Sequence, residues 1–321
     1  MITGGTGFFG KALLRHWLAA FEAGLTVPRV VVLSRRPTEF ASANPEFAHL
    51  PWLSFVEGDI LRPALLPRVD GVSHLIHAAA DSTLGPQLTA LERFDQIVSG
   101  TRHTLAWAAE MRVRRVLFCS SGGVYGQPPP DRGFIDESFH GMPDPLVSQN
   151  AYSVGKRAAE HLCSLYASQH GLEVVVARCF AFVGRDLPLD VHFAIGNFIR
   201  DALYRRAITV SGDGTAVRSY LDQRDLAAWL IAMLERGSAG RAYNVGSDQA
   251  ITTAELAQLV RDLLAPEKKV EILGTAPVGA NRHVYVPSIE RARCELGLDV
   301  LIPLRQAILD TASAQMGEGA W

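Results

Sequence analysis

Five short runs of β-branched and other apolar residues, separated by longer amphipathic stretches, constrain the fold of this chain most strongly. The runs are residues 29–33, 53–56, 73–77, 115–119 and 173–177. Apolar runs without polar alternation are typical of parallel strands that are buried on both faces of a sheet. Helical stretches lie between them, at residues 9–23, 88–111 and 152–169. This alternation predicts an α/β fold with a doubly wound parallel sheet.

The pattern changes after about residue 184, where Pro, Gly and Asp interrupt shorter segments. Helices are still predicted, at residues 195–204, 225–235 and 253–264, with strands at 208–210 and 242–245. We interpret residues 1–184, joined by about 221–248, as the main domain. About 185–220 and 249–321 then form a smaller, discontinuous lobe that binds the substrate, since open α/β sheets bind ligands beyond the carboxyl ends of their strands.

Composition excludes several classes of function. The formal net charge is -2, which gives no reason to expect a nucleic acid partner. No apolar run reaches the roughly 18 residues that cross a bilayer, and the start of the chain does not resemble a signal peptide. The four cysteines are scattered, which favours a reducing compartment and a cytoplasmic protein. No metal is expected, because His74 and His77 would lie on opposite faces of one strand.

A glycine-rich turn opens the chain. Gly4, Gly7 and Gly10 have the spacing of a dinucleotide-binding loop between a strand and a helix. The first glycine allows a tight turn, the second lets the backbone approach a pyrophosphate, and the third lets helix and strand pack closely. The amino end of the helix then offers free N–H groups to the anion. The sequence thus predicts a Rossmann domain with cofactor contacts at Gly4, Thr6, Gly7, Phe8, Phe9 and Gly10.

Three later segments extend the predicted cofactor site. The second strand ends in Ser34-Arg35-Arg36, with arginines where NAD-binding sites carry an acid, so Arg35 favours NADP over NAD. The alternative is that both arginines are ordinary surface charges. Asp59 and Ile60 are placed to meet the adenine. The small residues Ala78, Ala79 and Ala80 let the backbone lie close to the cofactor.

The predicted chemical centre contains a tyrosine and a lysine four residues apart. Tyr152 and Lys156 share one face of a helix. We expect the ammonium of Lys156 to lower the pKa of the phenol, so that Tyr152 can give or take a proton at a substrate oxygen. Lys156 can also hold the nicotinamide ribose. Ser121, after the strand at 115–119, can donate a hydrogen bond to the same oxygen. The alternatives are a solvent-facing helix pair and a plain serine-glycine turn.

Together these segments resemble the extended short-chain dehydrogenase/reductase family, in its NAD(P)-dependent epimerase/dehydratase branch that acts on nucleotide sugars. The resemblance covers nearly the whole chain and rests on residues 4–10, 58–60, 77–80, 120–126, 152–156, 218–221 and 243–246. It implies that Tyr152 is the catalytic acid or base with Lys156 as its partner, and that Ser121 is the catalytic serine. It further implies substrate contacts at Asn197, Arg218 and Arg282.

Departures from the family pattern narrow the reaction. Sugar 4,6-dehydratases of the family carry an acidic pair directly after the serine or threonine, whereas this chain has Gly122 and Gly123. Glycine cannot transfer protons, so a dehydratase is disfavoured. Two asparagines that the family usually carries are replaced here by Ile97 and Ala181, which affects the pose of the sugar and leaves the cofactor site intact.

The leading hypothesis is an NADP-dependent reductase acting at C4 of a nucleotide-diphosphate 4-keto sugar. A nucleotide-sugar 4-epimerase is the alternative. Less favoured hypotheses are a dehydratase, a reductase of a small non-sugar ketone and a non-catalytic dinucleotide-binding sensor. Relatives of this kind pair two helices across a two-fold axis, so the resemblance implies a homodimer.

Overall fold

The computed structural model describes residues 1–80, 88–129, 133–191, 193–275 and 283–317. By their internal contacts, the residues form two compact units. Unit 1 contains residues 1–126, 141–179 and 227–243, and unit 2 contains residues 127–140, 180–226 and 244–321. The glycine turn and the predicted Tyr/Lys pair both belong to unit 1.

The core of unit 1 is a sheet of seven strands in the order β11-β6-β5-β4-β1-β2-β3. Adjacent pairs from β3 through β6 run parallel. The strands are β1 (Ile2–Thr3), β2 (Val30–Ser34), β3 (Leu53–Glu57), β4 (His74–His77), β5 (Arg115–Ser121), β6 (Glu173–Cys179) and β11 (Ala242–Val245). The order reverses beside β1, which confirms the predicted doubly wound α/β fold.

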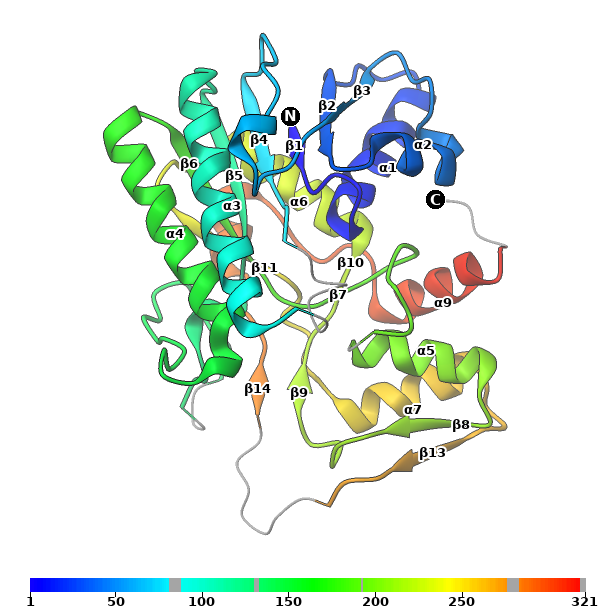
Figure 1. Ribbon diagram of the computed structural model, residues 1–321. Helices are drawn as coiled ribbons and strands as arrows, with labels where there is room; N and C mark the ends of the chain where they lie inside the picture. The colour runs from blue at the N-terminus through cyan, green and yellow to red at the C-terminus, as the bar shows by residue number, and fades with distance from the viewer. Residues whose placement is uncertain (81–87, 130–132, 192, 276–282, 318–321) are drawn as a thin grey trace. The chain divides into compact units, whose positions relative to one another are not determined.

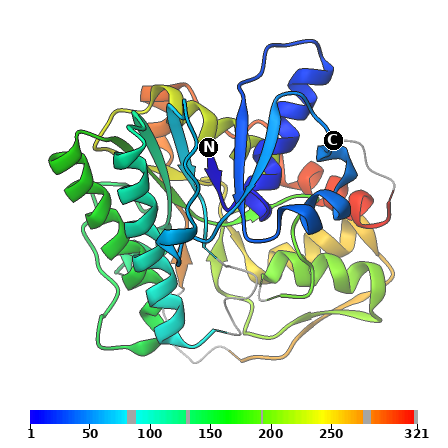
Figure 2. The same cartoon turned by 45° about the horizontal axis from the view of Figure 1, so that its top comes forward.

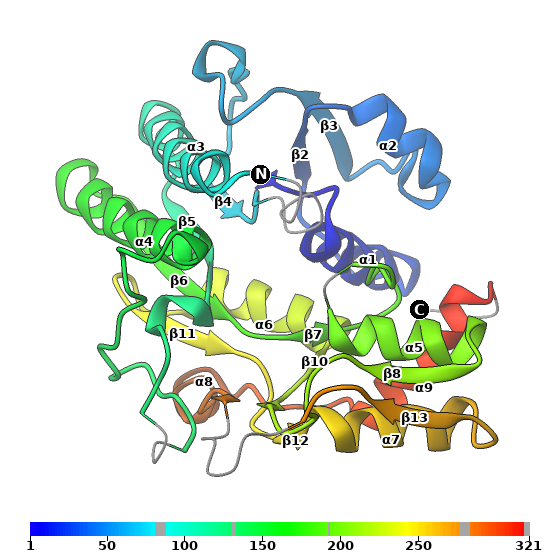
Figure 3. The ribbon, with the colours of Figure 1, turned by 60° about the horizontal axis from the view of Figure 1, so that its bottom comes forward.

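Helices cover both faces of this sheet. α3 (Ala90–Glu110) and α4 (Ala151–His170) lie side by side on one face, and α1 (Phe8–Glu22) and α6 (Gln223–Arg236) lie on the other (Figures 1 and 3). A capping box between Thr89 and Glu92 fixes the start of α3. The predicted helices are therefore present, with ends shifted by one or two residues. The short α2 (Pro37–Ala43) was not predicted.

Apolar side chains from α3, α4 and the strands fill the space beneath these two helices. The buried members of this cluster include Leu75, Ile97, Leu105, Trp107, Val116, Phe118, Ala159, Cys163 and Val174. The two helices approach closely at Gly155, where an added Cβ would lie 3.5 Å from Phe94 and Ile97. This packing holds the first turns of α3 and α4 at the carboxyl edge of the sheet.

Unit 2 is built from short strands and helices. β8 (Ala207–Val210) pairs in parallel with β13 (Lys269–Ile272), and α5 (Ala194–Tyr204) and α7 (Thr253–Leu264) pack beside them (Figure 2). A second sheet has the order β12-β9-β14, and β10 pairs with β7. The remaining elements are β7 (Phe182–Val183), β9 (Val217–Arg218), β10 (Leu221–Asp222), β12 (Ile251–Thr252), β14 (Val284–Tyr285), α8 (Glu290–Leu296) and α9 (Leu304–Gln315).

Candidate active site

The glycine turn has the geometry of a dinucleotide cradle. Gly4 has a φ of +76°, and an added Cβ would lie 2.6 Å from the backbone of Ala78 and Ala79. A Cβ on Gly10 would lie 2.2 Å from the Cα of Gly5. Gly7 is the N-cap of α1, and the nearest atom to a Cβ built on it would be the carbonyl oxygen of Gly4, at 3.6 Å. The residues present thus fit a bound pyrophosphate.

The other predicted cofactor residues follow the carboxyl ends of β2, β3 and β4. Arg35 is exposed just after β2, and Asp59 accepts a hydrogen bond from the N–H of Leu61 at 2.9 Å after β3. The N–H of Ala78 donates to Thr3 at 3.0 Å, which ties the segment after β4 to β1. Since β1 to β4 are neighbours in the sheet, the predicted cofactor residues all lie at the carboxyl edge of these strands.

Ser121, Tyr152 and Lys156 come from β5 and α4. Ser121 is the last residue of β5, is 7% exposed, and its Oγ accepts a hydrogen bond from the N–H of Gly123 at 3.1 Å. Tyr152 lies in the first turn of α4 and is partly buried. Lys156 is buried, and its Nζ donates to the carbonyl of Cys119 at 2.7 Å and lies 4.9 Å from the ring centre of Phe118.

The electrostatic state of this group differs from the sequence-based expectation. Burial raises the pKa of Tyr152 to about 12, opposed by a hydrogen bond from Ser121 and by the charge of Arg93. Burial also lowers the pKa of Lys156. The expectation that Lys156 lowers the pKa of Tyr152 is therefore wrong for this structure. The physical reason is that the desolvation of the phenol dominates its pKa while the ammonium is held by a main-chain carbonyl.

Glu160 and Arg178 form a half-buried ion pair next to the chemical centre, which the sequence analysis missed. Glu160 lies eight residues after Tyr152 on α4, and its carboxylate accepts from Ser120 at 2.6 Å and from Arg178 at 2.8 and 3.1 Å. Arg178 also lies 4.7 Å from the ring centre of Tyr125. These contacts fix α4 against the ends of β5 and β6. The sequence signal that could have identified Glu160 is its spacing, because it lies four residues after Lys156 and so shares a helix face with it.

His77 is a buried histidine that ties together three elements of unit 1. Its Nδ1 lies 2.6 Å from Oγ1 of Thr3 on β1, and its Nε2 lies 3.1 Å from Oγ1 of Thr101 on α3. The ring stacks on Phe118. Burial and the charge of Lys156 lower the pKa of His77 to about 3. The side chain is therefore a neutral structural link beneath the cofactor segment.

The stability of unit 1 should fall in mild acid because of His77. The folded-state pKa is lowered from 6.5, so the unfolded chain binds the proton more readily. The stabilisation is complete above pH 6.5 and is lost as the pH falls toward about 3, at up to ~1.4 kcal/mol per pH unit. Urea unfolding of the native chain and of His77→Gln at pH 5 and pH 7 measures this. Equal pH dependence in the two proteins would show that His77 is not the group responsible.

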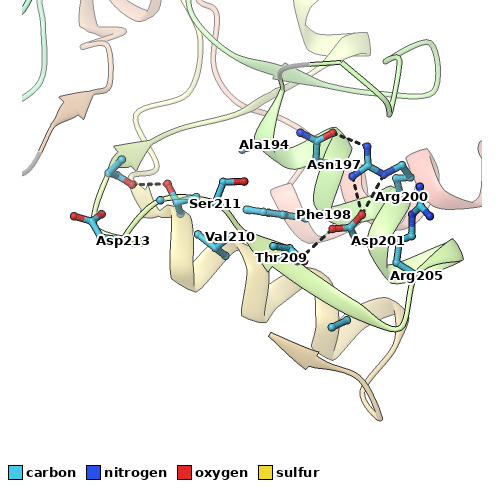
Figure 4. Close-up of a pocket in the computed structure, with 15 residues that line it drawn as sticks. Ala194, Asn197, Phe198, Arg200, Asp201, Arg205, Thr209, Val210, Ser211 and Asp213 are labelled. Carbon is cyan, nitrogen blue, oxygen red and sulfur yellow. Dashed lines mark hydrogen bonds and ion pairs between the residues drawn. The ribbon is translucent and has the colours of Figure 1, made fainter. Parts of the chain in front are cut away.

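Unit 2 contains a cavity of about 670 Å³ between α5 and the segment around β8 (Figure 4). Asn197, predicted as a substrate contact, lies on its wall, and its Oδ1 accepts a hydrogen bond from Arg200 at 3.1 Å. Arg200 also pairs with the buried Asp201 at 2.8 Å, and Asp201 accepts from the N–H of Thr209 at 3.2 Å. The sequence predicted Asn197, and it missed the wall residues from Arg205 onward because they come from separate segments.

Of the two arginines that were predicted as substrate contacts, the structure describes only Arg218. Arg218 lies on β9, donates to the carbonyls of Val217 at 2.8 Å and His283 at 3.0 Å, and is 5.6 Å from the ring centre of Tyr285. Burial lowers its pKa. Arg218 does not line the cavity beside Asn197. Arg282 lies outside the described residues.

No helix among the described residues is both long and apolar enough to span a bilayer. No group of three or more His, Cys, Asp or Glu side chains in that part of the chain could hold a metal ion.

The sheet, the glycine turn and the Ser121, Tyr152 and Lys156 arrangement define a Rossmann-type enzyme of the extended short-chain dehydrogenase/reductase class. Residues 1–246 match the model of the NAD dependent epimerase/dehydratase family, and the chain belongs to this family.

Known relatives within this class carry out several reactions. The chain is 29% identical to UDP-glucuronic acid decarboxylase 3 of Arabidopsis thaliana over 96% of this chain and 86% of that protein. It is similar to the structure of dTDP-glucose 4,6-dehydratase from Streptomyces venezuelae with NAD bound, with a TM-score of 0.82, 26% identity, and coverage of 98% and 96%. It also shares the fold of UDP-glucose 4-epimerase from Thermotoga maritima, with a TM-score of 0.81, 19% identity, and 98% of both chains covered.

Proposed function

We propose that this chain is an NADPH-dependent reductase that acts at C4 of a nucleotide-diphosphate 4-keto sugar. The observation that carries the proposal is the placement of Ser121, Tyr152 and Lys156 at the sheet edge that also carries the glycine turn. An acid/base phenol at that edge can serve a substrate oxygen next to a bound nicotinamide. The oxidoreductase and nucleotide-sugar parts of the proposal agree with the family to which the chain belongs.

The chain's own residues supply the proton and the alignment. A bound nicotinamide dinucleotide would provide the hydride. As C4 takes up the hydride, its carbonyl oxygen takes a proton from Tyr152, and Ser121 donates a hydrogen bond to the same oxygen. Lys156, now held by the carbonyl of Cys119, and Tyr152 would hold the nicotinamide ribose. Gly122 and Gly123 supply no acid for elimination of water.

The cavity in unit 2 supports a nucleoside diphosphate as the handle of the substrate. Arg205 and the amide N–H groups of Asn197 on its wall can bind phosphate oxygens. Its volume of about 670 Å³ lies within the range of small-molecule sites. We propose Asn197 and Arg218 as substrate contacts of this lobe. Thermal shift with UDP and with dTDP tests this, because a ligand that binds only the folded state raises the melting temperature.

The cofactor preference is expected to depend on Arg35. Arg35→Ala removes a guanidinium from the end of β2, where a 2′-phosphate would be bound. We expect kcat/KM for NADPH to fall about tenfold or more, since hydrogen bonds to charged groups contribute roughly 1.5–3 kcal/mol. The value for NADH should stay the same. Arg36→Ala is the matched control, because Arg36 pairs with Glu39 at 3.4 Å. An equal loss with both cofactors would refute the assignment.

A second candidate is a reaction in which C4 is first oxidised and then reduced by the same retained cofactor. The relatives in Arabidopsis favour it, since they are UDP-glucuronic acid decarboxylases that match 96% of the chain. A nucleotide-sugar 4-epimerase would use the same two steps. Such an enzyme consumes no NADPH overall, which separates it from the reductase.

The deciding assay follows NADPH absorbance with a nucleotide-linked 4-keto-6-deoxy sugar. The reductase consumes one NADPH for each sugar reduced. Conversion of UDP-glucuronic acid or UDP-glucose without added cofactor would instead establish the second candidate. Binding of a nucleotide sugar with no turnover of any of these substrates would contradict both.

We also propose a homodimer that forms through α3 and α4. Both helices carry exposed apolar side chains on the surface of unit 1, with Leu91 77% exposed and Leu165 39% exposed. Exposed apolar surface can mark a protein–protein contact, and a two-fold contact uses the same surface on both subunits. Light scattering coupled to size exclusion measures the mass in solution, and a monomer at micromolar concentration would contradict the proposal.

A cytoplasmic location is likewise a proposal. Cys119, Cys163, Cys179 and Cys294 are free thiols, which suits a reducing compartment. Fractionation of the source cells tests it directly.

A further inference from the structure

Arg93 is a cationic side chain in the first turns of α3 that has no part in the proposed mechanism. Its Nε is buried and has no hydrogen-bond partner among the residues that the structure describes. Leaving a buried polar group unpaired costs free energy, more so for a charged one. A cation kept in such a place calls for a functional explanation.

The packing of α3 and α4 places Arg93 opposite Tyr152. The two helices run parallel, because each connects neighbouring parallel strands of one sheet (Figures 1 and 3). They touch where Gly155 meets Phe94 and Ile97, at 3.5 Å from an added Cβ. Tyr152 lies three residues before Gly155, and Arg93 lies four residues before Ile97. Residues at these spacings share a helix face. Arg93 and Tyr152 therefore face each other about one helical turn before the contact at Gly155, toward the amino ends of α3 and α4.

Acidic neighbours of Arg93 on its own helix are engaged elsewhere. Glu92 accepts hydrogen bonds from the N–H and hydroxyl of Thr89, at 2.9 and 2.7 Å. Asp95 accepts one from Ser99 at 2.7 Å. Neither carboxylate is paired with the guanidinium of Arg93 in these contacts, so its charge remains available to the other side of the interface.

The groups that act on the phenol of Tyr152 come from β5, β6 and α3. They are Ser121 and Cys119 on β5, Cys179 on β6 and Arg93 on α3. Among them, the two thiols raise the pKa of Tyr152, whereas the hydrogen bond from Ser121 and the charge of Arg93 lower it. On α4 itself, Lys156 donates to the carbonyl of Cys119. Arg93 therefore supplies the stabilising positive charge that the sequence analysis assigned to Lys156.

We propose that Arg93 is a positioning residue that acts through Tyr152, by holding a positive charge opposite the phenol and stabilising its deprotonated form. The inference rests on the proposed function, because it matters for the reaction only if Tyr152 exchanges the proton. A deprotonated phenol forms in either direction of hydride transfer, after Tyr152 gives its proton or before it takes one.

The test is the titration of Tyr152 itself, followed by NMR of protein labelled with ¹³C at the Cζ of tyrosine, with and without saturating NADP⁺. The Tyr152 resonance is the one missing from Tyr152→Phe. Arg93→Gln and Arg93→Met remove the charge, and Arg93→Lys keeps it. Arg102→Gln is the matched control, because Arg102 is an exposed arginine two to three turns further along α3.

We expect the Tyr152 midpoint to rise measurably in Arg93→Gln and Arg93→Met, and to stay near the native value in Arg93→Lys and Arg102→Gln. With an active substrate, the pH profile of kcat should move to higher pH by the same amount. An unchanged midpoint in a folded charge-removing variant overturns the inference. If the native chain turns over no nucleotide sugar, the proposed function fails, while the NMR titration still decides the role of Arg93.

Discussion

Tyr152→Phe is expected to lower kcat by about 10³-fold while leaving the affinity for the dinucleotide nearly unchanged. Removal of a positioned general acid or base typically costs 10²- to 10⁴-fold, and phenylalanine keeps the ring that packs against the apolar cluster of unit 1. The loss should lie in kcat, because the proton transfer belongs to the transition state. Stopped-flow measurement of hydride transfer, together with cofactor titration, separates the two quantities.

The control for this variant is Tyr166→Phe. Tyr166 lies on the same helix, partly buried, and its ring stacks on His170 at 5.1 Å between centroids. The same chemical change at this position should leave kcat within about twofold of the native value, as for most substitutions away from a site. A Tyr152→Phe enzyme that retained native kcat would remove Tyr152 from the mechanism, along with the roles given to Ser121 and Arg93.

Gly10→Ala should destabilise unit 1 by about 3 kcal/mol or more and abolish dinucleotide binding. The new methyl group would lie 2.2 Å from the Cα of Gly5. The atoms of Gly5 that it would meet are all backbone atoms. No side chain can therefore rotate away, and α1 must shift from the sheet. Overpacking of this kind typically costs 1–3 kcal/mol, and occasionally more. Urea unfolding gives the free energy, and isothermal titration with NADPH gives the binding.

Gly7→Ala serves as the comparison because it tests the same turn without the steric overlap. The nearest atom to a Cβ at Gly7 is the carbonyl oxygen of Gly4, at 3.6 Å, and the residue is exposed. We expect a loss of stability below about 1 kcal/mol, typical of an N-cap change. The Kd for NADPH should still rise about tenfold or more, since the methyl group occupies the approach of the pyrophosphate. Unaltered binding in Gly7→Ala would show that the turn is only structural.

The parallel sheet could be predicted because its signals are local. Continuous apolar runs mark strands that are buried on both faces, and the glycine spacing marks the strand-turn-helix unit at the start. The predicted strand at 173–177 is thus present in β6. In unit 2 the strands are only two to four residues long. Such strands carry too few residues for a period to show, and their pairing depends on segments that are distant in sequence.

The candidate site could be predicted where one helix or one strand end carries its members. Tyr152 and Lys156 follow from helical spacing, and Ser121 follows from the end of β5. Arg93 could not be found in this way, because its relation to Tyr152 depends on how α3 and α4 pack at Gly155. The pKa of Tyr152 was also mispredicted, since desolvation by the folded chain outweighs the effect that helical spacing suggests.

Transfer of deuterium from the reduced cofactor tests the central claim most directly. The protein is mixed with NADPH that carries deuterium at the transferable position of C4 of its nicotinamide ring, and with a nucleotide-linked 4-keto-6-deoxy sugar. Mass spectrometry and proton NMR of the sugar then locate the label. The proposed reaction places deuterium at C4 of the sugar, and Tyr152→Phe makes this transfer about 10³-fold slower. A reduced sugar without deuterium at C4, or native transfer in Tyr152→Phe, would contradict the account.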